Sequence, residues 1–197
     1  MNKRMSIGYL ELIIGPMFSG KTSKLLEIYK QCKFCNISVA VINHGDDKRY
    51  SDNMLSTHDK IMIPCIQTNR LWDLWNYNDI ENVFNIQAQN HLIIRDADVI
   101  LINEGQFFED LYEVVISMLK SNKKIYISGL DGDFQRKKFG QILDLIPLCD
   151  KVTKLNSLCG ICKDGTPGLF SLRLTNESEQ MLIGVDNYIP VCRKCYK

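Results

Sequence analysis

Residues 15–22 read GPMFSGKT, a complete G-x-x-x-x-G-K-[ST] phosphate loop. An apolar run at residues 9–14 (YLELII) precedes the loop and predicts a buried strand, and the amphipathic residues 19–34 behind it predict a helix. Glycines allow backbone N–H groups to close around phosphate oxygens, and the helix directs its positive N-terminal end toward them. This context favours a binding site for ATP or GTP over a glycine-rich turn that binds no nucleotide.

Two side chains in the loop have predicted roles. Lys21 supplies a positive charge to the β- and γ-phosphates, and the hydroxyl of Thr22 is placed to bind Mg²⁺. The whole loop is predicted to bind the nucleotide, through Gly15, Pro16, Met17, Phe18, Ser19, Gly20, Lys21 and Thr22.

Size and charge narrow the class of protein. The chain has 197 residues, of which 45% are hydrophobic, so it can bury a core. Its 24 basic and 23 acidic residues give a net charge of +1, which disfavours nucleic acid as a partner and favours a small ligand. No run approaches the ~18 apolar residues of a membrane span, and residues 1–7 lack the apolar core of a signal peptide. We therefore expect a cytoplasmic protein with no membrane partner.

Apolar runs rich in β-branched residues alternate with helical patterns along the chain. The clearest strands are residues 38–43, 98–102 and 124–128, and residues 110–120 predict a second helix. This alternation predicts an α/β fold with a mostly parallel sheet and helices on both faces.

Two further segments lie between these elements, at residues 44–63 and 70–87. Residues 44–63 lack periodicity and predict a long, mobile loop after the second strand, at the edge of the sheet where ligands bind in α/β proteins. Residues 70–87 carry Trp72 and Trp75 at roughly helical spacing and predict a helical packing surface. The composition changes near Leu155, which divides the chain into a phosphate-loop domain (1–154) and a small cysteine-bearing domain (155–197).

Two C-x-x-C pairs lie in the C-terminal segment. Cys159-x-x-Cys162 and Cys192-x-x-Cys195 can present four thiolates to one Zn²⁺, and a closed site of this kind is structural. Reduced structural thiols are the alternative, and a redox role is disfavoured because neither pair opens a helix after a strand.

The other four cysteines have no ligand pattern of this strength. Cys32-x-x-Cys35 has no evident partner pair, and Cys65 and Cys149 are isolated. We expect ordinary, partly buried thiols at Cys32 and Cys35.

Residues 98–108 (DVILINEGQFF) predict a buried strand that ends in Asn103 and Glu104. In phosphate-loop folds the strand-end position usually carries an Asp that bears on Mg²⁺, and the next acidic residue is well placed as a general base. The alternative is a strand-end carboxylate that is solvated in a turn.

Several motifs together resemble one known family, the type II thymidine kinases, which have a RecA-like core and a zinc-bearing lasso domain. The motifs occur in the family's order, and they are residues 15–22 (GPMFSGKT), 48–50 (KRY), 56–59 (STHD), 104–108 (EGQFF), 130–140 (LDGDFQRKKFG) and 191–196 (VCRKCY). The likeness runs from about residue 8 to the last residue.

The resemblance implies ATP-dependent phosphorylation of the thymidine 5′-hydroxyl, with Glu104 as the base that accepts the hydroxyl proton. Arg49 and Arg136 would be cations near the transferring phosphate, a role that suits the charge spread over the phosphoryl oxygens. Arginines in surface loops are more often simply solvated. The resemblance also implies inhibition by dTTP and a homo-oligomer, either a dimer or a tetramer.

The family's nucleoside pocket would be built from aromatic and apolar side chains that suit a pyrimidine ring. Its predicted members are Met17, Phe107, Leu130, Phe134, Phe139 and Tyr188. The lasso, residues 171–188, would cover the nucleoside and bind its base edge mainly through main-chain groups, with the contacts at Ser171, Met181, Leu182, Ile183 and Gly184.

Two departures from the family's pattern affect these expectations. The family usually has Asp where this chain has Asn103, which predicts weaker Mg²⁺ binding that Asp47 or Asp133 could compensate. The family commonly has two glycines where this chain has Ile183 and Gly184, so the lasso backbone and the range of nucleosides are expected to differ.

Three other functions fit parts of this pattern. The nearest is a broader deoxypyrimidine nucleoside kinase. A nucleotide-binding, zinc-stabilised module without catalysis is suggested by Asn103 and opposed by Glu104. A zinc-ribbon ATPase that acts on nucleic acid is disfavoured by the net charge of +1.

Overall fold

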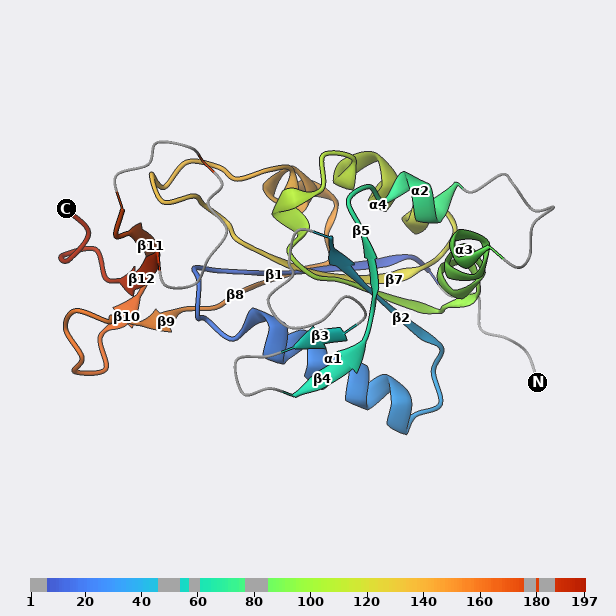
Figure 1. Cartoon of the computed structure of the whole chain (residues 1–197), viewed down its shortest axis with the longest axis horizontal. Helices are drawn as coiled ribbons and strands as arrows, with labels where there is room; N and C mark the ends of the chain where they lie inside the picture. Colours follow the sequence, from blue (N-terminus) through green and yellow to red (C-terminus); the bar gives the residue numbers. More distant parts are fainter. Residues whose placement is uncertain (1–6, 46–53, 57–60, 77–84, 176–179, 181–186) are drawn as a thin grey trace.

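The computed structural model describes residues 7–45, 54–56, 61–76, 85–175, 180 and 187–197 (Figure 1). A six-stranded sheet runs through the centre in the order β5-β2-β6-β7-β1-β8, and every neighbouring pair is parallel. Its strands are β1 (Tyr9–Ile14), β2 (Val39–His44), β5 (Ile66–Thr68), β6 (Val99–Ile102), β7 (Lys124–Gly129) and β8 (Lys151–Lys154). The predicted α/β fold with a mostly parallel sheet is confirmed.

One face of the sheet is covered by α1 (Lys21–Phe34) and by the antiparallel pair β3 (Met54–Ser56) and β4 (Met62–Pro64) (Figure 1). Side chains at alternate positions of the strands point to this face, because successive residues of a strand alternate between faces. They form a buried cluster with the apolar side of the helix and with the hairpin, and its members include Ile13, Leu25, Val41, Leu55, Ile63 and Leu101.

The opposite face is covered by α2 (Trp72–Trp75), α3 (Ile86–Asp96), α4 (Leu111–Lys120) and the 3₁₀ segment η2 (Ile142–Leu148) (Figure 1). The intervening strand positions point here and pack in a larger cluster, which includes Leu12, Ile42, Ile100, Phe108, Val115 and Ile127. Both faces of the central strands β1, β2, β6 and β7 are therefore largely buried, which explains their mostly apolar sequences, whereas the edge strands β5 and β8 are more exposed.

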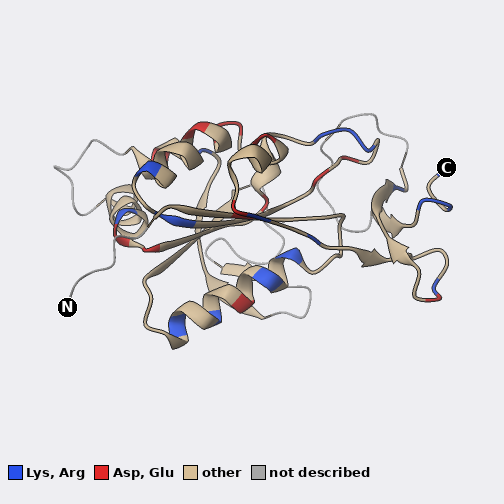
Figure 2. Cartoon of the chain, turned by 180° about the vertical axis from the view of Figure 1, so that it is seen from behind, with Lys and Arg blue, Asp and Glu red and all other residues tan. Residues whose placement is uncertain are grey.

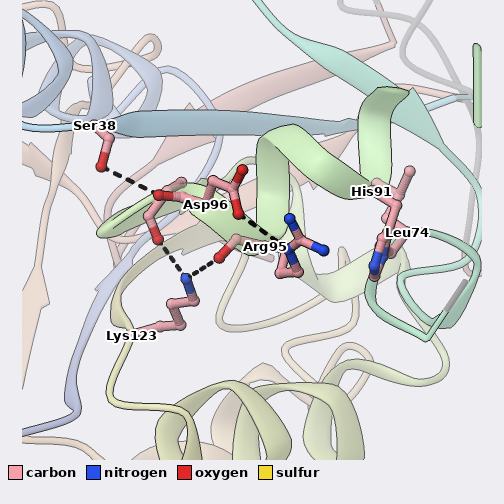
Figure 3. Close-up of polar contacts among 7 residues, drawn as sticks. Ser38, Leu74, His91, Arg95, Asp96 and Lys123 are labelled. Carbon is pink, nitrogen blue, oxygen red and sulfur yellow. Dashed lines mark hydrogen bonds and ion pairs between the residues drawn. The ribbon is translucent and has the colours of Figure 1, made fainter. Parts of the chain in front are cut away.

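The carboxyl end of α3 is fixed by a lysine from the turn before β7 (Figure 3). Lys123 Nζ donates to the carbonyl oxygens of Arg95 (2.5 Å) and Ala97 (2.6 Å), so a cation lies at the negative end of the helix. At the other side of the helix, His91 Nδ1 lies 2.8 Å from the carbonyl oxygen of Leu74, which joins α3 to α2.

A small C-terminal module follows β8. It contains two antiparallel pairs, β9 (Ser157–Leu158) with β10 (Pro167–Gly168), and β11 (Phe170–Arg173) with β12 (Tyr188–Val191). Its own apolar cluster is centred on Cys159, Val191 and Cys192. The short strands alone bury little surface, so the cysteine cluster described below has to supply much of the module's stability.

Two local expectations need correction. Residues 44–63 do not form only a loop, because β3 pairs with β4, and Leu55 and Ile63 are buried in the cluster that contains α1. The packing surface predicted over residues 70–87 is confirmed in part, because Trp72 and Trp75 pack against the core, but α2 is a single turn that ends at Trp75 and a separate helix, α3, begins at Ile86. Asn85 caps α3 by accepting a hydrogen bond from the N–H of Gln87 (3.0 Å), which is a sequence signal that our interpretation missed.

The structure also shows where the charged residues and the thiols of Cys32 and Cys35 lie. The charged residues of α1 are mostly basic, with Lys21, Lys24, Lys30 and Lys33 against Glu27, whereas basic and acidic segments are mixed over the helices of the opposite face (Figure 2). Cys32 is buried as part of the core, whereas Cys35 is exposed, so the expectation of a partly buried thiol at Cys35 was wrong. Within the described ranges, no helix combines the length and the apolar character needed to cross a bilayer.

A buried carboxylate joins β1 to the edge strand β8. Glu11 accepts hydrogen bonds from Thr153 Oγ1 (2.7 Å) and Tyr9 Oη (3.1 Å), and it pairs with Lys151 Nζ (3.0 Å). Burial opposes ionisation of Glu11, but the hydrogen bonds from Thr153, Lys151 and Tyr9 outweigh it and lower the pKa of the carboxyl below its ordinary 4.5. Burial and the bond to Glu11 raise the pKa of Tyr9 to about 12.

Glu11→Gln should therefore lower the stability of the protein at pH 7 by about 1–3 kcal/mol, since hydrogen bonds to a charged group are lost. Because the pKa of Glu11 is depressed in the folded state, its contribution is complete above 4.5 and declines as the pH falls through the folded value. Urea unfolding at pH 7 and at decreasing pH should show the gap between parent and variant closing in acid. Glu27→Gln, at an exposed ion pair, is the matched control and should change stability little. A gap for Glu11→Gln that is constant with pH would contradict this assignment.

Candidate active site

The phosphate loop joins β1 to α1 at the carboxyl edge of the sheet, and two glycines determine its shape. Gly15 has φ 153°, and a Cβ there would overlap the carbonyl oxygen of Leu155. Gly20 has φ 83° and is the N-cap of α1, a left-handed conformation that other residues adopt only with strain. Gly15 is thus required because a carbonyl oxygen lies too close to admit a Cβ, and Gly20 is required because of its left-handed backbone conformation.

Lys21 lies over the loop in a buried position. Its Nζ donates to the carbonyl oxygen of Pro16 (2.6 Å) and lies 3.4 Å from Ser19 Oγ. The ammonium group is thereby held inside the ring of backbone N–H groups that the sequence predicts as the phosphate site.

Asn103 brings the ends of three strands to the phosphate loop. It follows β6, is 1% exposed, and its Oδ1 accepts hydrogen bonds from Ser128 Oγ (2.8 Å) and, at a longer 3.4 Å, from Thr22 Oγ1. Its Nδ2 donates to Asn43 Oδ1 (2.9 Å). The sequence analysis missed Asn43 and Ser128, although both are polar residues at the carboxyl end of an apolar strand, which is a usable signal.

Glu104 is next in the chain and has a backbone φ of 53°. A left-handed conformation costs a non-glycine residue about 1–3 kcal/mol and is a frequent feature of functional sites. The carboxylate Oε2 accepts a hydrogen bond from Gln106 Nε2 (2.7 Å), and Gln106 Oε1 accepts one from the N–H of Leu130 (2.9 Å). Gln106, which is 3% exposed and was also missed, thus links the predicted base to the loop of the predicted nucleoside pocket.

The predicted pocket residues take part in three groups of contacts. Phe107 packs edge-on against Phe139, with ring centroids 5.5 Å apart, and His44 packs against Phe107 at 5.4 Å. The N–H of Met17 donates to Ser171 Oγ (2.9 Å), so the phosphate loop touches the C-terminal module. Phe134 and Tyr188 are joined by Arg173, whose guanidinium stacks on the ring of Phe134 and donates to the hydroxyl of Tyr188.

Of the two arginines predicted to lie near the transferring phosphate, only Arg136 is among the described residues. The guanidinium of Arg136 lies 4.2 Å from the ring centroid of Tyr196 and 5.8 Å from that of Phe170, so it contacts the C-terminal module, and its role near the phosphate stays a prediction. Arg49 lies outside the described residues, as do Asp47, Met181, Leu182, Ile183 and Gly184.

The four C-terminal cysteines form one cluster. All four sulfur atoms lie within 4.8 Å of one another, and Cys162 Sγ is 3.8 Å from Cys192 Sγ and 3.5 Å from Cys195 Sγ. Tetrahedral zinc with Zn–S bonds of about 2.3 Å places sulfurs about 3.8 Å apart, so the cluster is compatible with a structural Zn²⁺. A backbone hydrogen bond from Cys162 is the main cause that lowers the pKa of Cys159 to about 6, whereas hydrogen bonds with the neighbouring thiols raise the pKa of Cys162 to about 12, so a cation is needed to hold all four sulfurs as thiolates.

A magnesium site would need oxygen ligands in place of the thiolates that suit zinc. Within the described part of the chain, these cysteines are the sole group of three or more His, Cys, Asp or Glu side chains that could hold a metal ion. Thr22 Oγ1 and Asn103 Oδ1 are oxygen donors of the kind that Mg²⁺ prefers, and the ion often takes its remaining ligands from water and substrate phosphates.

A comparison with protein-family models finds that the model described as "Thymidine kinase" matches residues 8–196. The chain belongs to the thymidine kinase family. It is 42% identical over 194 residues to the thymidine kinase of Sheeppox virus (strain KS-1), covering 98% of both chains. It is 41% identical over 196 residues to thymidine kinase a of Arabidopsis thaliana, covering 98% of this chain and 77% of the plant protein. The resemblance found in the sequence is therefore confirmed along nearly the whole chain.

The geometry of the cysteine cluster predicts one zinc ion per chain in the purified protein. Cys195→Ser should lose the metal and lower the unfolding temperature of the C-terminal module, because three thiolates no longer close the tetrahedral site. Zinc content by elemental analysis and thermal unfolding would check this result. Cys35→Ser, which alters an exposed thiol outside the cluster, is the matched control and should keep the metal. A Cys195→Ser protein with a full complement of zinc would contradict the assignment.

Proposed function

We propose that this chain transfers the γ-phosphoryl group of ATP to the 5′-hydroxyl of thymidine, giving dTMP. The observation that carries the proposal is the family match over residues 8–196, which includes the phosphate loop and the Asn103–Glu104 pair at one edge of the sheet. Thymidine and ATP are accordingly its proposed substrates.

The phosphate loop binds and orients the triphosphate. Its backbone N–H groups and the N-terminal end of α1 attract the phosphate oxygens, and Lys21 adds a charge that neutralises the transferring group. Mg²⁺ bound at the hydroxyl of Thr22 and the amide oxygen of Asn103 would supply further neutralisation of the phosphates. Phosphoryl transfer depends mainly on such positioning and electrostatic stabilisation.

Glu104 accepts the proton of the 5′-hydroxyl as the oxygen attacks the γ-phosphorus. Two features support this role: the residue follows Asn103, which contacts Thr22, and Gln106 holds its carboxylate in one orientation. The apolar and aromatic pocket, which includes the packed rings of Phe107 and Phe139, binds the base.

Other properties are proposed from the family resemblance or from the sequence alone. These are division of the chain into residues 1–154 and 155–197, a homo-oligomer of two or four chains, inhibition by dTTP, and a cytoplasmic location. The difference at Ile183 and Gly184 supports a second candidate, a kinase that also accepts deoxycytidine.

Purified protein should convert thymidine to dTMP when ATP is present, and Glu104→Gln should reduce kcat by about 10²–10⁴-fold because the general base is lost. Product formation would be measured by chromatography with thymidine and deoxycytidine in parallel. Glu109→Gln, at an exposed position beside the pocket segment, is the matched control and should retain the parent's activity. Equal rates with both nucleosides would favour the broader kinase, and full activity of Glu104→Gln would remove Glu104 from the mechanism.

Asn103→Asp should lower the Mg²⁺ concentration needed for half-maximal rate. Two unit charges about 4 Å apart interact by about 1 kcal/mol in bulk water, and a buried carboxylate beside a divalent ion contributes at least this much, which corresponds to about a fivefold change or more. The neighbouring Asn43 can keep its contact by turning its amide, so that it donates to the new carboxylate. Magnesium titrations at saturating nucleoside would measure the effect, with Asn36→Asp on the exposed surface as the control. An unchanged Mg²⁺ dependence would contradict the proposed place of Asn103.

A further inference from the structure

Arg173, the last residue of β11, makes the contact that joins two predicted pocket residues. Its guanidinium carbon lies 3.7 Å from the ring centroid of Phe134. Its Nε and Nη2 donate to the hydroxyl oxygen of Tyr188 (3.2 and 2.5 Å), and Nη2 also donates to the carbonyl oxygen of Gln180 (3.2 Å). No sequence motif singled out this residue.

The side chain of Arg173 is only 7% exposed, which limits where it can lie. A buried cation is costly unless its N–H groups find acceptors and its charge finds a favourable partner. Among the described residues, its acceptors include a phenol and a carbonyl, and its charge lies over the face of an aromatic ring. Only a planar guanidinium can stack on one ring and direct two N–H groups to the same hydroxyl.

The position of Arg173 along β11 is fixed at a second point. Ser171, two residues earlier and also buried on that strand, accepts a hydrogen bond from the N–H of Met17 in the phosphate loop. Residues two apart in a strand project from the same face. One face of β11 therefore contacts the phosphate loop at Ser171 and the ring of Phe134 at Arg173.

The backbone around Phe134 is fixed independently of its ring. Tyr196 Oη donates to the carbonyl oxygen of Phe134, and the carboxylate of Asp133 accepts hydrogen bonds from the N–H groups of Gln135 (2.8 Å) and Lys137 (2.9 Å). Gln180 Nε2 donates to the same carboxylate (2.7 Å). With the backbone held in this way, the guanidinium stacked on the ring is placed to set the plane of the Phe134 ring.

We propose that Arg173 is a positioning residue for nucleoside recognition, which sets the ring of Phe134 and the hydroxyl of Tyr188 at the spacing that a pyrimidine base requires. It touches neither the phosphoryl group nor the phosphate loop, so it acts on nucleoside affinity and leaves ATP binding and the chemical step intact. This inference rests on the proposed thymidine kinase activity.

Steady-state kinetics of Arg173→Ala and Arg173→Lys, with thymidine and ATP varied in turn, test the proposal. We expect KM for thymidine to rise about tenfold or more in both variants, since a wall of the pocket displaced by about 1 Å is enough for such losses. The values of kcat and of KM for ATP should stay within about threefold of the parent, well short of tenfold. Lysine should not rescue, because its point charge cannot reproduce the stacked fork.

Arg193→Ala is the matched control. Arg193 belongs to the same module and lies over the ring of Phe170 (5.2 Å), but it is exposed, so its loss should leave KM for thymidine unchanged. Zinc content would be measured for every variant. Should Arg173→Ala fail to fold, Arg173→Lys carries the test, because it keeps both the alkyl stem and the charge.

A double-mutant cycle with Tyr188→Phe gives a second measurement. If Arg173 acts through the hydroxyl of Tyr188, the double variant Arg173→Ala/Tyr188→Phe should be no worse in KM for thymidine than Arg173→Ala alone. Full rescue by lysine, additive effects in the cycle, or equal losses for thymidine and ATP would each overturn the proposal. A parent protein that phosphorylates no thymidine would instead overturn the proposed function, and the two failures are thus distinguishable.

Discussion

The hydrogen-bonded network around Asn103 is the constraint on which the candidate site depends. Asn103 directly follows β6 and contacts Asn43 near the end of β2, Ser128 near the end of β7 and Thr22 at the start of α1. Parallel strands end at the same edge, so the sheet brings these residues together from distant parts of the sequence. Each amide group has a partner, and among the described residues no buried side-chain nitrogen or oxygen lacks a hydrogen bond. The network also determines where Glu104 lies, because Glu104 is the next residue and turns away in a left-handed conformation.

The phosphate loop is held from two directions, and this explains why the C-terminal module belongs to the architecture of the site. From the sheet, β1 continues directly into the loop, and Leu155 donates its N–H to the carbonyl oxygen of Ile14 (2.8 Å) while its own carbonyl oxygen packs against Gly15. From the module, Ser171 on β11 accepts a hydrogen bond from Met17. Strands as short as β11 and β12 are not stable alone, so a metal at the neighbouring cysteines is a sufficient reason for β11 to stay in register with β12.

Much of this arrangement could be predicted from the sequence, and the rest depends on tertiary contacts. The phosphate loop, the strand that ends in Asn103 and Glu104, and the cysteine pairs were predictable because each has a local pattern with a chemical cause. The hairpin of β3 and β4 was not, because each strand has three residues, and it forms only where Leu55 and Ile63 meet α1. Gln106 and Arg173 were missed for a different reason, since a buried polar side chain is recognised by its partners, and those partners are far away in the sequence.

The contacts of the C-terminal module are divided unequally between the two halves of the proposed site. The proposed triphosphate half is built from β1, α1 and the ends of β6 and β7, and among the described residues the module's side chains reach the phosphate loop through Ser171. The proposed nucleoside half has three links to the module, namely Tyr196 to the carbonyl of Phe134, Arg136 stacked on Tyr196, and Arg173 on the ring of Phe134. Two of these links are to one aromatic residue that directly follows Cys195 of the cysteine cluster. A metal bound at the cluster would therefore stabilise mainly the proposed nucleoside pocket, and it would act on the phosphate loop through Ser171.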